Sequence, residues 1–114
     1  MSMIDLIEKA LDIRAFYQRV LASNIANVET PGYKEKEIDF KAELERLGGG
    51  GMESGIRVGE KTDGVGSSSV DDNTVVIEGQ IVKMTENTLM FNSLVQLINK
   101  KFSMIRYAIN EGRK

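Results

Sequence analysis

The stretch "ASNIANVETPGYKEKEIDF", Ala22–Phe40, holds the single proline of the 114-residue chain. Pro31 lacks a backbone donor and keeps Thr30 away from helical angles, so a helix that enters this stretch must end before it. Pro31 followed by Gly32 is typical of the central positions of a type II turn, because glycine tolerates the positive φ that the turn requires. The stretch therefore predicts a helix, a Pro-Gly turn and then an extended segment.

Two asparagines precede this helix stop on one helical edge. Asn24 and Asn27 are three residues apart, so their side-chain amides can reach the carbonyl groups freed at the helix end, or the turn itself. We expect Tyr33 to fold back on the helix end. An ordinary helix stop would explain the same residues, and the residues alone leave both interpretations open.

The segment before the turn has apolar residues at helical spacing, which predicts a helix from Ser2 to Val28 with a broad apolar surface. Ser2 can cap this helix, and Asp5, three residues later, supplies the carboxylate of a capping box. The apolar positions are Leu6, Ala10, Ile13, Tyr17 and Val20, with Ile7, Leu11, Leu21, Ile25 and Val28 beside them.

The last third of the chain carries a heptad stripe, which predicts a long helix from about Val76 to Asn110 with one face against partner helices. The predicted packing interface consists of Ile77, Ile81, Met84, Phe91, Val95, Ile98, Phe102, Ile105 and Ile109, and Thr88 is the one polar position in the stripe. A second stripe beside it contains Met90, Leu94, Leu97, Met104 and Ala108. Two adjoining stripes indicate several helical neighbours, because a two-stranded seam needs only one.

The middle of the chain, residues 34–73, contains too few apolar side chains to offset the entropy of ordering, above all at Gly48–Gly51 and Asp63–Asn73. We expect a flexible Gly/Ser-rich linker here. A short helix at Phe40–Leu47 and a strand-like piece at Gly55–Val58 can form inside it.

These predictions give one all-α domain. Residues 1–33 form the N-terminal helix and the turn, residues 34–73 the linker, and residues 74–114 the C-terminal heptad helix. The two long terminal helices are expected to form an antiparallel, coiled-coil-like hairpin. A lone pair of helices cannot cover all the apolar faces, and an exposed apolar surface of that size normally marks an interface.

The composition excludes most kinds of catalytic and metal-binding site. Without cysteine and histidine the chain has no thiol, no imidazole and no common zinc ligand, so we expect no enzyme activity, no metal site and no cofactor. "GIRVGEKT" is not a phosphate loop, because Glu60 separates Gly59 from Lys61. "DDNT" fits helix capping by Asp72, Asn73 or Thr74 better than calcium binding.

The net charge of -2 gives no electrostatic argument for binding to nucleic acid. The segment from Ile98 to Lys114 is locally basic, which complements a helix dipole as readily as it binds phosphate. The start "MSMIDLIEKALDIR" has no long apolar run. We therefore expect neither a cleavable signal peptide nor direct insertion into a membrane.

The sequence "LASNIANVETPGYK" resembles the signature of the bacterial flagellar axial proteins, the rod and hook family, in which the N-terminal helix runs into Asn-x-x-Thr-Pro-Gly-Tyr. The segments "KEKEIDF", "DDNTV" and "SLVQLINKKFSMIRYAINEGR" are most similar to the proximal rod members. The resemblance covers both terminal regions and leaves out the linker. The matching positions are Asn24, Asn27, Thr30, Pro31, Gly32 and Tyr33.

The resemblance implies a structural subunit of the proximal rod of the flagellar basal body, which polymerises through its terminal helices and transmits torque across the envelope. Contacts that do not close into a ring generate such a filament. The implied route is the flagellar type III export apparatus, without a cleavable signal peptide, to the periplasmic side of the cytoplasmic membrane. The implied partners are further copies of the chain, other rod proteins, the rod-adaptor protein FliE and the MS ring.

A different class of protein also fits part of the sequence. A soluble helical adaptor or export chaperone could use the stripe from Ile77 to Ile109 to bind an amphipathic partner helix. This alternative explains the heptads and the flexible middle. It does not explain Asn-x-x-Thr-Pro-Gly-Tyr.

Overall fold

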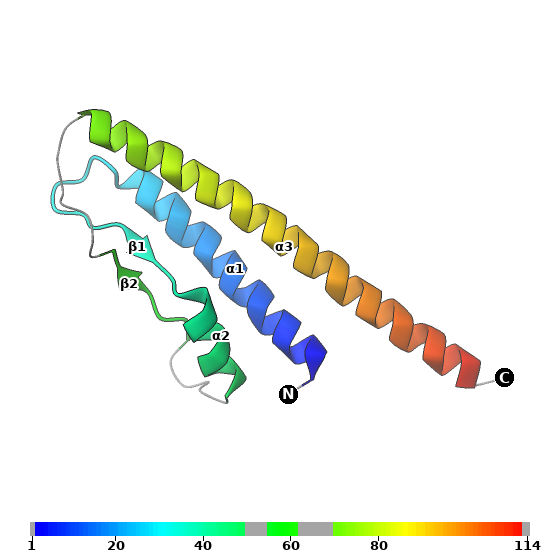
Figure 1. Ribbon diagram of the computed structural model, residues 1–114. Coiled ribbons are helices and arrows are strands. Elements are labelled where there is room, and N and C mark those ends of the chain that lie inside the picture. The colour runs from blue at the N-terminus through cyan, green and yellow to red at the C-terminus, as the bar shows by residue number, and fades with distance from the viewer. Residues whose placement is uncertain (1, 50–54, 62–69, 113–114) are drawn as a thin grey trace.

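The computed structural model describes residues 2–49, 55–61 and 70–112, and within them the chain is mostly helical (Figure 1). A long helix lies near each end of the chain, in agreement with the predicted all-α class. In chain order the elements are α1 (Met3–Ala26), β1 (Lys36–Glu37), α2 (Phe40–Gly48), β2 (Gly59–Glu60) and α3 (Val70–Gly112).

Helix α1 begins at the predicted cap. The Ser2 hydroxyl accepts a hydrogen bond from the Asp5 amide at 3.1 Å, and the Asp5 carboxylate accepts one from the Ser2 amide at 3.4 Å. This reciprocal pairing satisfies donors that the first helical turn leaves free, and it confirms the predicted capping box. The helix ends at Ala26, two residues earlier than predicted, with Asn27 as its C-cap.

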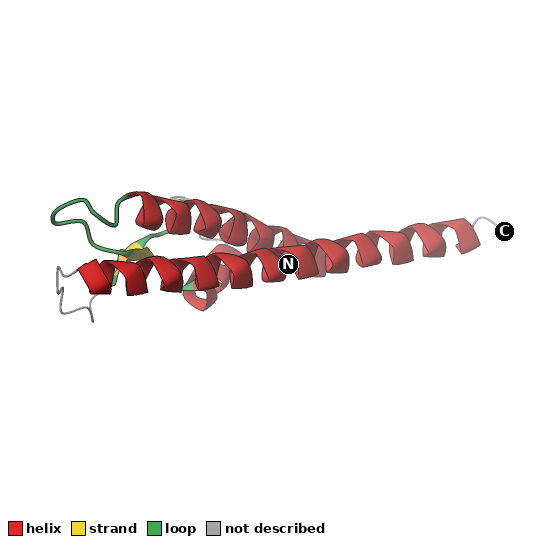
Figure 2. Cartoon of the chain, turned by 90° about the horizontal axis from the view of Figure 1, so that it is seen from above, coloured by secondary structure: helices red, strands yellow, loops and turns green. Residues whose placement is uncertain are grey.

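Helix α3 packs beside α1 and runs in the opposite direction (Figures 1 and 2). Hydrogen bonds show the pairing, because Arg14 meets Asn87 whereas Asn24, ten residues later, meets Gln80. The two helices contain 24 and 43 residues, so their lengths are about 36 and 64 Å at 1.5 Å per residue. The longer helix therefore extends past the N-terminus of α1 (Figure 1).

The start of α3 differs from the prediction. The helix begins at Val70, six residues before the predicted start at about Val76. Asp72, Asn73 and Thr74 thus lie within the helix, and the prediction that one of them caps it is wrong. An acidic and polar run can continue a helix when the following turns are held by tertiary packing, since propensity is only a weak guide.

Helix α2 and a two-stranded ribbon form a third layer on α1 (Figure 1). Among the described residues α1 contacts α3, α2 and β1, whereas α2 and α3 do not meet. The predicted short helix is confirmed, and Asp39 caps it by accepting the Ala42 amide at 3.0 Å. The predicted strand at Gly55–Val58 is wrong, because β2 is formed by the next two residues, Gly59–Glu60.

The ribbon pairs β1 with β2 antiparallel, with Lys36 opposite Glu60. The remaining parts of the predicted linker, 50–54 and 62–69, lie outside the described residues. The linker region that the structure does describe thus contains α2 and the ribbon.

The buried apolar core is small and centred on α1. Five of its six described members come from α1 because that helix is covered on two sides. The members are Ile7, Ala10, Ile13, Val20, Leu21 and Ile98. A core this small leaves most apolar side chains of α3 uncovered within the chain.

Candidate functional site

The predicted turn motif forms a hydrogen-bonded junction at the end of α1, and Asn24 is its centre. The Asn24 side chain is 2% exposed. Its Oδ1 accepts hydrogen bonds from the Lys36 amide and the Tyr33 hydroxyl, each at 2.9 Å. Its Nδ2 donates to the Lys36 carbonyl at 2.8 Å and to Gln80 Oε1 at 3.1 Å. All four hydrogen-bonding positions of the carboxamide are therefore occupied.

Asn24 acts on Lys36 as a neighbouring strand would. Its carboxamide pairs with both the N–H and the C=O of Lys36, directly where β1 begins. The chain after the turn is thereby fixed against α1. On the other edge of this segment, the Lys61 amide donates to the Glu35 carbonyl at 2.8 Å and extends the ribbon pairing.

The junction continues into α3 through Glu35. Its Oε1 accepts hydrogen bonds from Gln80 Nε2 at 2.6 Å and from Lys83 Nζ at 3.0 Å, and Lys61 Nζ lies 3.7 Å from Oε2. Burial of the carboxylate raises the pKa of Glu35, but the hydrogen bonds and positive charges outweigh burial, so its pKa lies below the ordinary value. Gln80 thus links Asn24 to Glu35, and one polar network joins α1, the turn segment and α3.

The turn itself is held by Asn27 and Thr30. Asn27 Nδ2 donates at 2.9 Å to the Ser23 carbonyl, which also accepts the Asn27 amide, and Asn27 Oδ1 accepts from the Thr30 hydroxyl at 3.2 Å. The Tyr33 amide donates to the Thr30 carbonyl at 3.1 Å, and Gly32 has a φ of 76°. Pro31, between them, is exposed. The motif residues thus extend from the last turns of α1 into the turn segment, where Tyr33 binds Asn24 and Thr30 binds Asn27.

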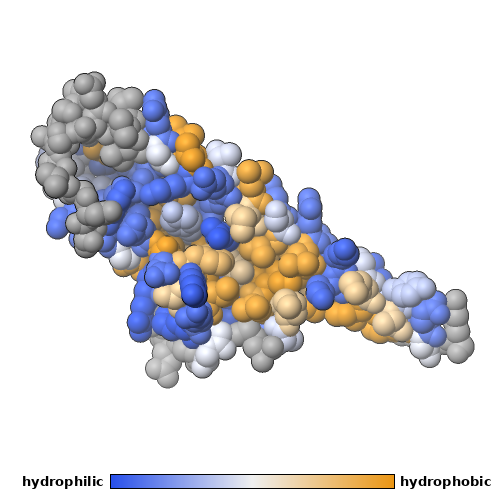
Figure 3. Space-filling view, viewed as in Figure 1, coloured by the Kyte–Doolittle hydropathy of each residue, from blue (hydrophilic) through white to orange (hydrophobic). Residues whose placement is uncertain are grey.

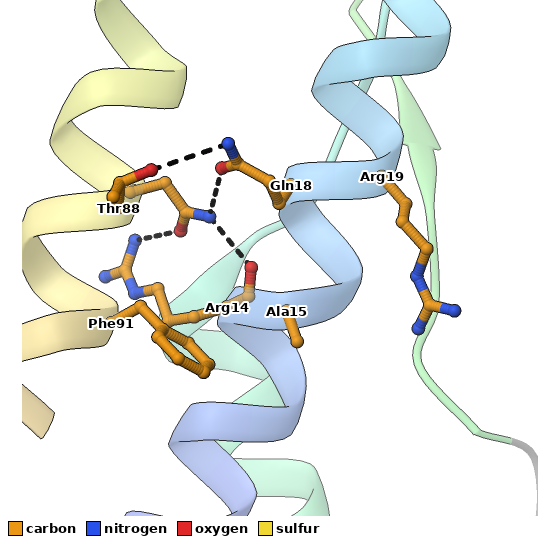
Figure 4. Close-up of a pocket in the computed structure, with 7 residues that line it drawn as sticks. Arg14, Ala15, Gln18, Arg19, Thr88 and Phe91 are labelled. Atoms are coloured by element: carbon orange, nitrogen blue, oxygen red, sulfur yellow. Dashed lines mark hydrogen bonds between the residues drawn. The ribbon is translucent and has the colours of Figure 1, made fainter. Parts of the chain in front are cut away.

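A second polar site lies between the long helices and forms a groove of about 400 Å³ (Figure 4). Asn87 of α3 is 2% exposed and donates to the Arg14 carbonyl at 2.8 Å and to Gln18 Oε1 at 2.9 Å. Its Oδ1 accepts from Arg14 Nη1 at 3.4 Å. Phe91 closes the groove on α3, and the Arg19 side chain points away from it (Figure 4).

Arg14 connects three elements. Its guanidinium lies 3.9 Å from the centre of the Phe40 ring on α2, in cation–π geometry, while the same group reaches Asn87 on α3. Burial lowers the pKa of Arg14, partly offset by Tyr17, yet the group stays charged because guanidinium deprotonates only in strong base. No local pattern predicts this bridge, since its partners Phe40 and Asn87 are far from Arg14 in the chain.

The seam that α3 buries within the chain differs from the predicted packing interface. Its members, spaced three and four residues apart, are Ile77, Gln80, Met84, Asn87, Phe91, Leu94 and Ile98. Of the nine predicted residues, Ile98 is buried, and Ile77, Met84, Phe91 and Val95 are half-buried; Ile81, Phe102, Ile105 and Ile109 are exposed. For these four exposed side chains, a contact to another subunit stays a prediction.

Apart from the exposed Ile81, the large uncovered apolar residues in the described part of α3 lie in two places. The first is the end that extends past α1, which we call the α3 overhang, residues 102–112; Phe102, Ile105 and Ile109 there are 42%, 45% and 52% exposed. The second is a stripe on another face of α3, made of Val82, Leu89, Met90, Leu97 and Met104. In Figure 3 hydrophobic side chains gather over the N-terminal half of α1 and continue along α3 toward its C-terminus.

An apolar groove of about 470 Å³ lies between α1 and α2, lined chiefly by Met3, Leu6 and Leu44. It is found at the end of the molecule that also carries the α3 overhang (Figure 1). Both surfaces are open, and both are built from side chains that water solvates poorly. Exposed apolar surfaces of this kind are typical of protein–protein interfaces.

Sequence reasoning missed a buried carboxylate in α2. Glu43 accepts hydrogen bonds from Arg46 at 2.7 Å and from the Arg57 amide at 3.0 Å, and Arg46 also donates to the Gly55 carbonyl. The hydrogen bond from Arg46 is the main cause of the lowered pKa of Glu43. This pairing fixes the segment before β2 to α2. An acidic residue in a charged helix gave no hint of burial.

The described residues contain no group of three acidic or metal-ligating side chains placed to hold a metal ion. No helix in the described ranges is both long enough and apolar enough to cross a bilayer. The described residues do contain two polar networks between the long helices, one at Asn24 and Gln80 and one at Asn87.

Comparison with known proteins identifies the family. Residues 10–34, which contain the motif, match the family model described as flagella basal body rod protein. The flagellar basal body rod protein FlgB of Cereibacter sphaeroides is 35% identical over 117 residues, covering 89% of this chain and 88% of that protein. FlgB of Proteus mirabilis is 27% identical over 125 residues, covering 92% and 91%. FlgB of Escherichia coli is 52% identical over 40 residues, 35% of this chain and 29% of that protein. The chain therefore belongs to the FlgB family of flagellar basal body rod proteins and is a structural subunit of that rod.

Proposed function

We propose that this chain builds the proximal part of the rod by polymerising through its terminal helices, with α1 and α3 acting as an antiparallel, coiled-coil-like hairpin. The observation that carries the proposal is the α3 overhang. Its apolar side chains are exposed within the chain, and an exposed apolar surface of this kind normally marks an interface with a neighbour.

The placement of the apolar surfaces supports a filament. The overhang and the groove lined by Met3, Leu6 and Leu44 are different surfaces, so a contact between them on two copies is heterologous. Heterologous contacts that do not close generate helical assemblies. A tube of interlocked helices transmits torque through packing alone, so this function needs no catalytic residue.

The turn motif has a mechanical role in this proposal. The Pro31–Gly32 pair, as a type II turn, ends α1 at a defined length, and the Asn24 network directs the following chain back along α1 toward β1. The third layer thereby stays on α1 and leaves the outer face of α3 free for neighbours.

We also propose the export route and partners that family membership implies. The chain would pass unfolded through the flagellar type III export apparatus, without a cleavable signal peptide, and assemble on the periplasmic side of the cytoplasmic membrane. Its neighbours would be the MS ring, FliE and other rod proteins. The small core supports this route, because few buried contacts must be broken before threading.

The proposal is tested by electron microscopy of basal bodies from a strain that lacks this gene. We expect the membrane ring to remain and the rod to be lost, with the rod restored by the intact gene. A gene carrying Phe102→Ser and Ile105→Ser should fail to restore it, although the variant is still exported. The matched control is Ser93→Ala, an exposed change on α3 outside the overhang. Intact rods without the gene would refute the proposal.

A further inference from the structure

The apolar repeat of α3 does not by itself determine where α3 lies along α1. The seam repeats every seven residues, so a slide of one heptad, about 10.5 Å along the helix axis, would place Met84, Phe91 and Ile98 where Ile77, Met84 and Phe91 lie now. The exposed Ile105 would then take the place of Ile98. Lys101 would take the place of the half-buried Leu94, while the other apolar positions of the seam would stay filled. The apolar side chains alone therefore discriminate little between the two registers, and polar interactions must choose between them.

Two polar residues interrupt this seam, and each is satisfied at only one level of α1. Asn87 binds the Arg14 carbonyl and Gln18, and Gln80 accepts from Asn24 while it donates to Glu35. Both amides are 2% exposed, so water cannot replace lost partners. After a slide of one heptad, Leu94 would face Arg14 and Gln18, and the shorter Asn87 would take the place of Gln80.

We propose that Gln80 and Asn87 are positioning residues that fix the register of α3 on α1, and thereby the length of the α3 overhang. A buried amide in an apolar helical seam commonly specifies register at a cost in stability. The inference concerns the single chain, so it stands or falls separately from the proposed role in the rod. Its consequence is that the overhang offered to neighbours has one defined length.

Engineered cysteine pairs in the full-length purified chain report the register, because the chain has no cysteine of its own. Ala15 and Thr88 are both exposed and line the same groove (Figure 4), so Ala15→Cys with Thr88→Cys reports the present register. Ala15→Cys with Val95→Cys reports a slide of one heptad. A bis-maleimide shorter than about 10 Å, less than the length of one heptad, distinguishes the two pairs.

The decisive variant moves both amides by one heptad without changing the composition: Gln80→Leu, Asn87→Gln and Leu94→Asn together. In the parent chain we expect crosslinking at the 15–88 pair alone. In the permuted variant the yield ratio should shift toward the 15–95 pair by tenfold or more, the change that about 1.4 kcal/mol of register preference gives. The matched control exchanges the same residue types on exposed positions, Asn92→Leu with Leu97→Asn, and should leave the ratio unchanged.

Three results would overturn the inference. The first is a permuted variant that is helical by circular dichroism and still crosslinks only at the 15–88 pair. The second applies if the permuted variant does not fold, in which case the single variant Asn87→Leu is tested. We expect Asn87→Leu to crosslink at both the 15–88 and the 15–95 pair. Crosslinking of Asn87→Leu at the 15–88 pair alone would contradict the inference. The third is a parent chain that does not crosslink at 15–88 at all.

Discussion

Asn24 shows how one side chain can replace an element of secondary structure. Its carboxamide supplies one donor and one acceptor to Lys36, as a strand would, and its remaining positions bind Tyr33 and Gln80. No other side chain of this length carries both groups: aspartate has no donor, and glutamine is longer by one methylene. The family motif begins at this residue, and the hydrogen bonds give a physical reason for an asparagine there.

We predict that Asn24→Ala lowers the free energy of unfolding by about 2 to 3 kcal/mol, because one buried and three partly buried hydrogen bonds lose their common partner. Urea denaturation followed by circular dichroism measures the change. Asn92→Ala, an exposed change on α3, should alter stability by less than about 0.5 kcal/mol. Equal effects for the two variants would show that the junction contributes nothing.

Gly32 and Gly79 provide a matched pair for the turn. A Cβ atom would meet nothing within 4 Å at either position, so neither substitution causes a clash with neighbouring residues. Gly32 has a φ of 76°, whereas Gly79 lies within α3. Gly32→Ala should lower stability by about 1 to 2 kcal/mol, and Gly79→Ala should raise it by up to about 1 kcal/mol. Thermal unfolding of both variants measures the sign of each change.

The stronger substitution Gly32→Val tests the same turn in the cell. A β-branched residue tolerates positive φ poorly, so we predict that the variant is exported but is absent from rods. Fractionation of basal bodies with immunoblotting would measure both steps. Normal incorporation of this variant would mean that the turn is not needed for assembly.

At the scale of the element, α3 is the helix that combines two functions. Its first half packs on α1 through a seam with two buried amides, whereas residues 102–112 extend beyond α1 with apolar side chains exposed. The first half therefore contributes to the fold of the chain. The overhang carries exposed apolar side chains, and we expect it to contribute little to that fold.

This division predicts different changes in stability for substitutions in the α3 overhang and in the buried core between the helices. Phe102→Ser with Ile105→Ser should change the stability of the dilute chain by less than about 0.5 kcal/mol, because both side chains are exposed. Ile13→Ala, a substitution in the core of α1, should cost about 2 to 5 kcal/mol. Chemical denaturation of the two variants makes the comparison. A large loss on changing the overhang would show that it packs on its own chain.

The segment between the turn and β1 depends on the charge of Glu35. Its folded pKa lies below the ordinary value of 4.5, so its stabilising contribution is complete above that pH and is lost as the pH falls through the folded pKa. The pKa of Lys83 is raised: burial lowers it, but the hydrogen bond and charge of Glu35 outweigh burial. Its contribution is therefore lost only at strongly alkaline pH, above the ordinary value of 10.5.

We therefore predict that the Tm of the parent chain falls as the pH drops below about 4.5, and that Glu35→Gln reduces this fall. The comparison is a set of melts of both proteins between neutral and acidic pH. Glu86→Gln, an exposed change on α3, is the control and should follow the parent curve. If Glu35→Gln also follows the parent curve, the network does not couple to the fold.

At the scale of the whole molecule, the chain is elongated, with extents of 68 × 28 × 18 Å. This shape gives a large surface for a small core, which has six buried apolar members among the residues that the structure describes. A subunit whose surface is completed by neighbours needs no larger core. The helical adaptor alternative also uses exposed apolar helices, but it accounts for neither the turn motif nor the FlgB relatives.

The small core predicts marginal stability for the isolated chain. In dilute solution we expect a broad, low-temperature melt, with helicity and Tm rising as the protein concentration increases, because association stabilises the folded state by mass action. Circular dichroism melts over a range of concentrations provide the test. A sharp melt that is independent of concentration would contradict the idea that burial between subunits completes the fold.

The sequence alone was sufficient for features that depend on neighbouring residues. The Ser2–Asp5 capping box, the ending of α1 before Pro31 and the long heptad helix were predicted because capping, proline sterics and apolar periodicity act over a few residues. The family was predicted from the resemblance of its motif, which is one contiguous stretch and can therefore be read without the fold.

Tertiary structure decided what depends on distant partners. Gln80 and Asn87 take buried seam positions that an apolar pattern assigned to Ile81 and Thr88, because their amides find partners on α1 and the turn segment. The burial of Glu43 likewise required Arg46 and the chain after it to come together. A buried polar group is stable only when its partners are in place, and the sequence does not state which distant residues those are.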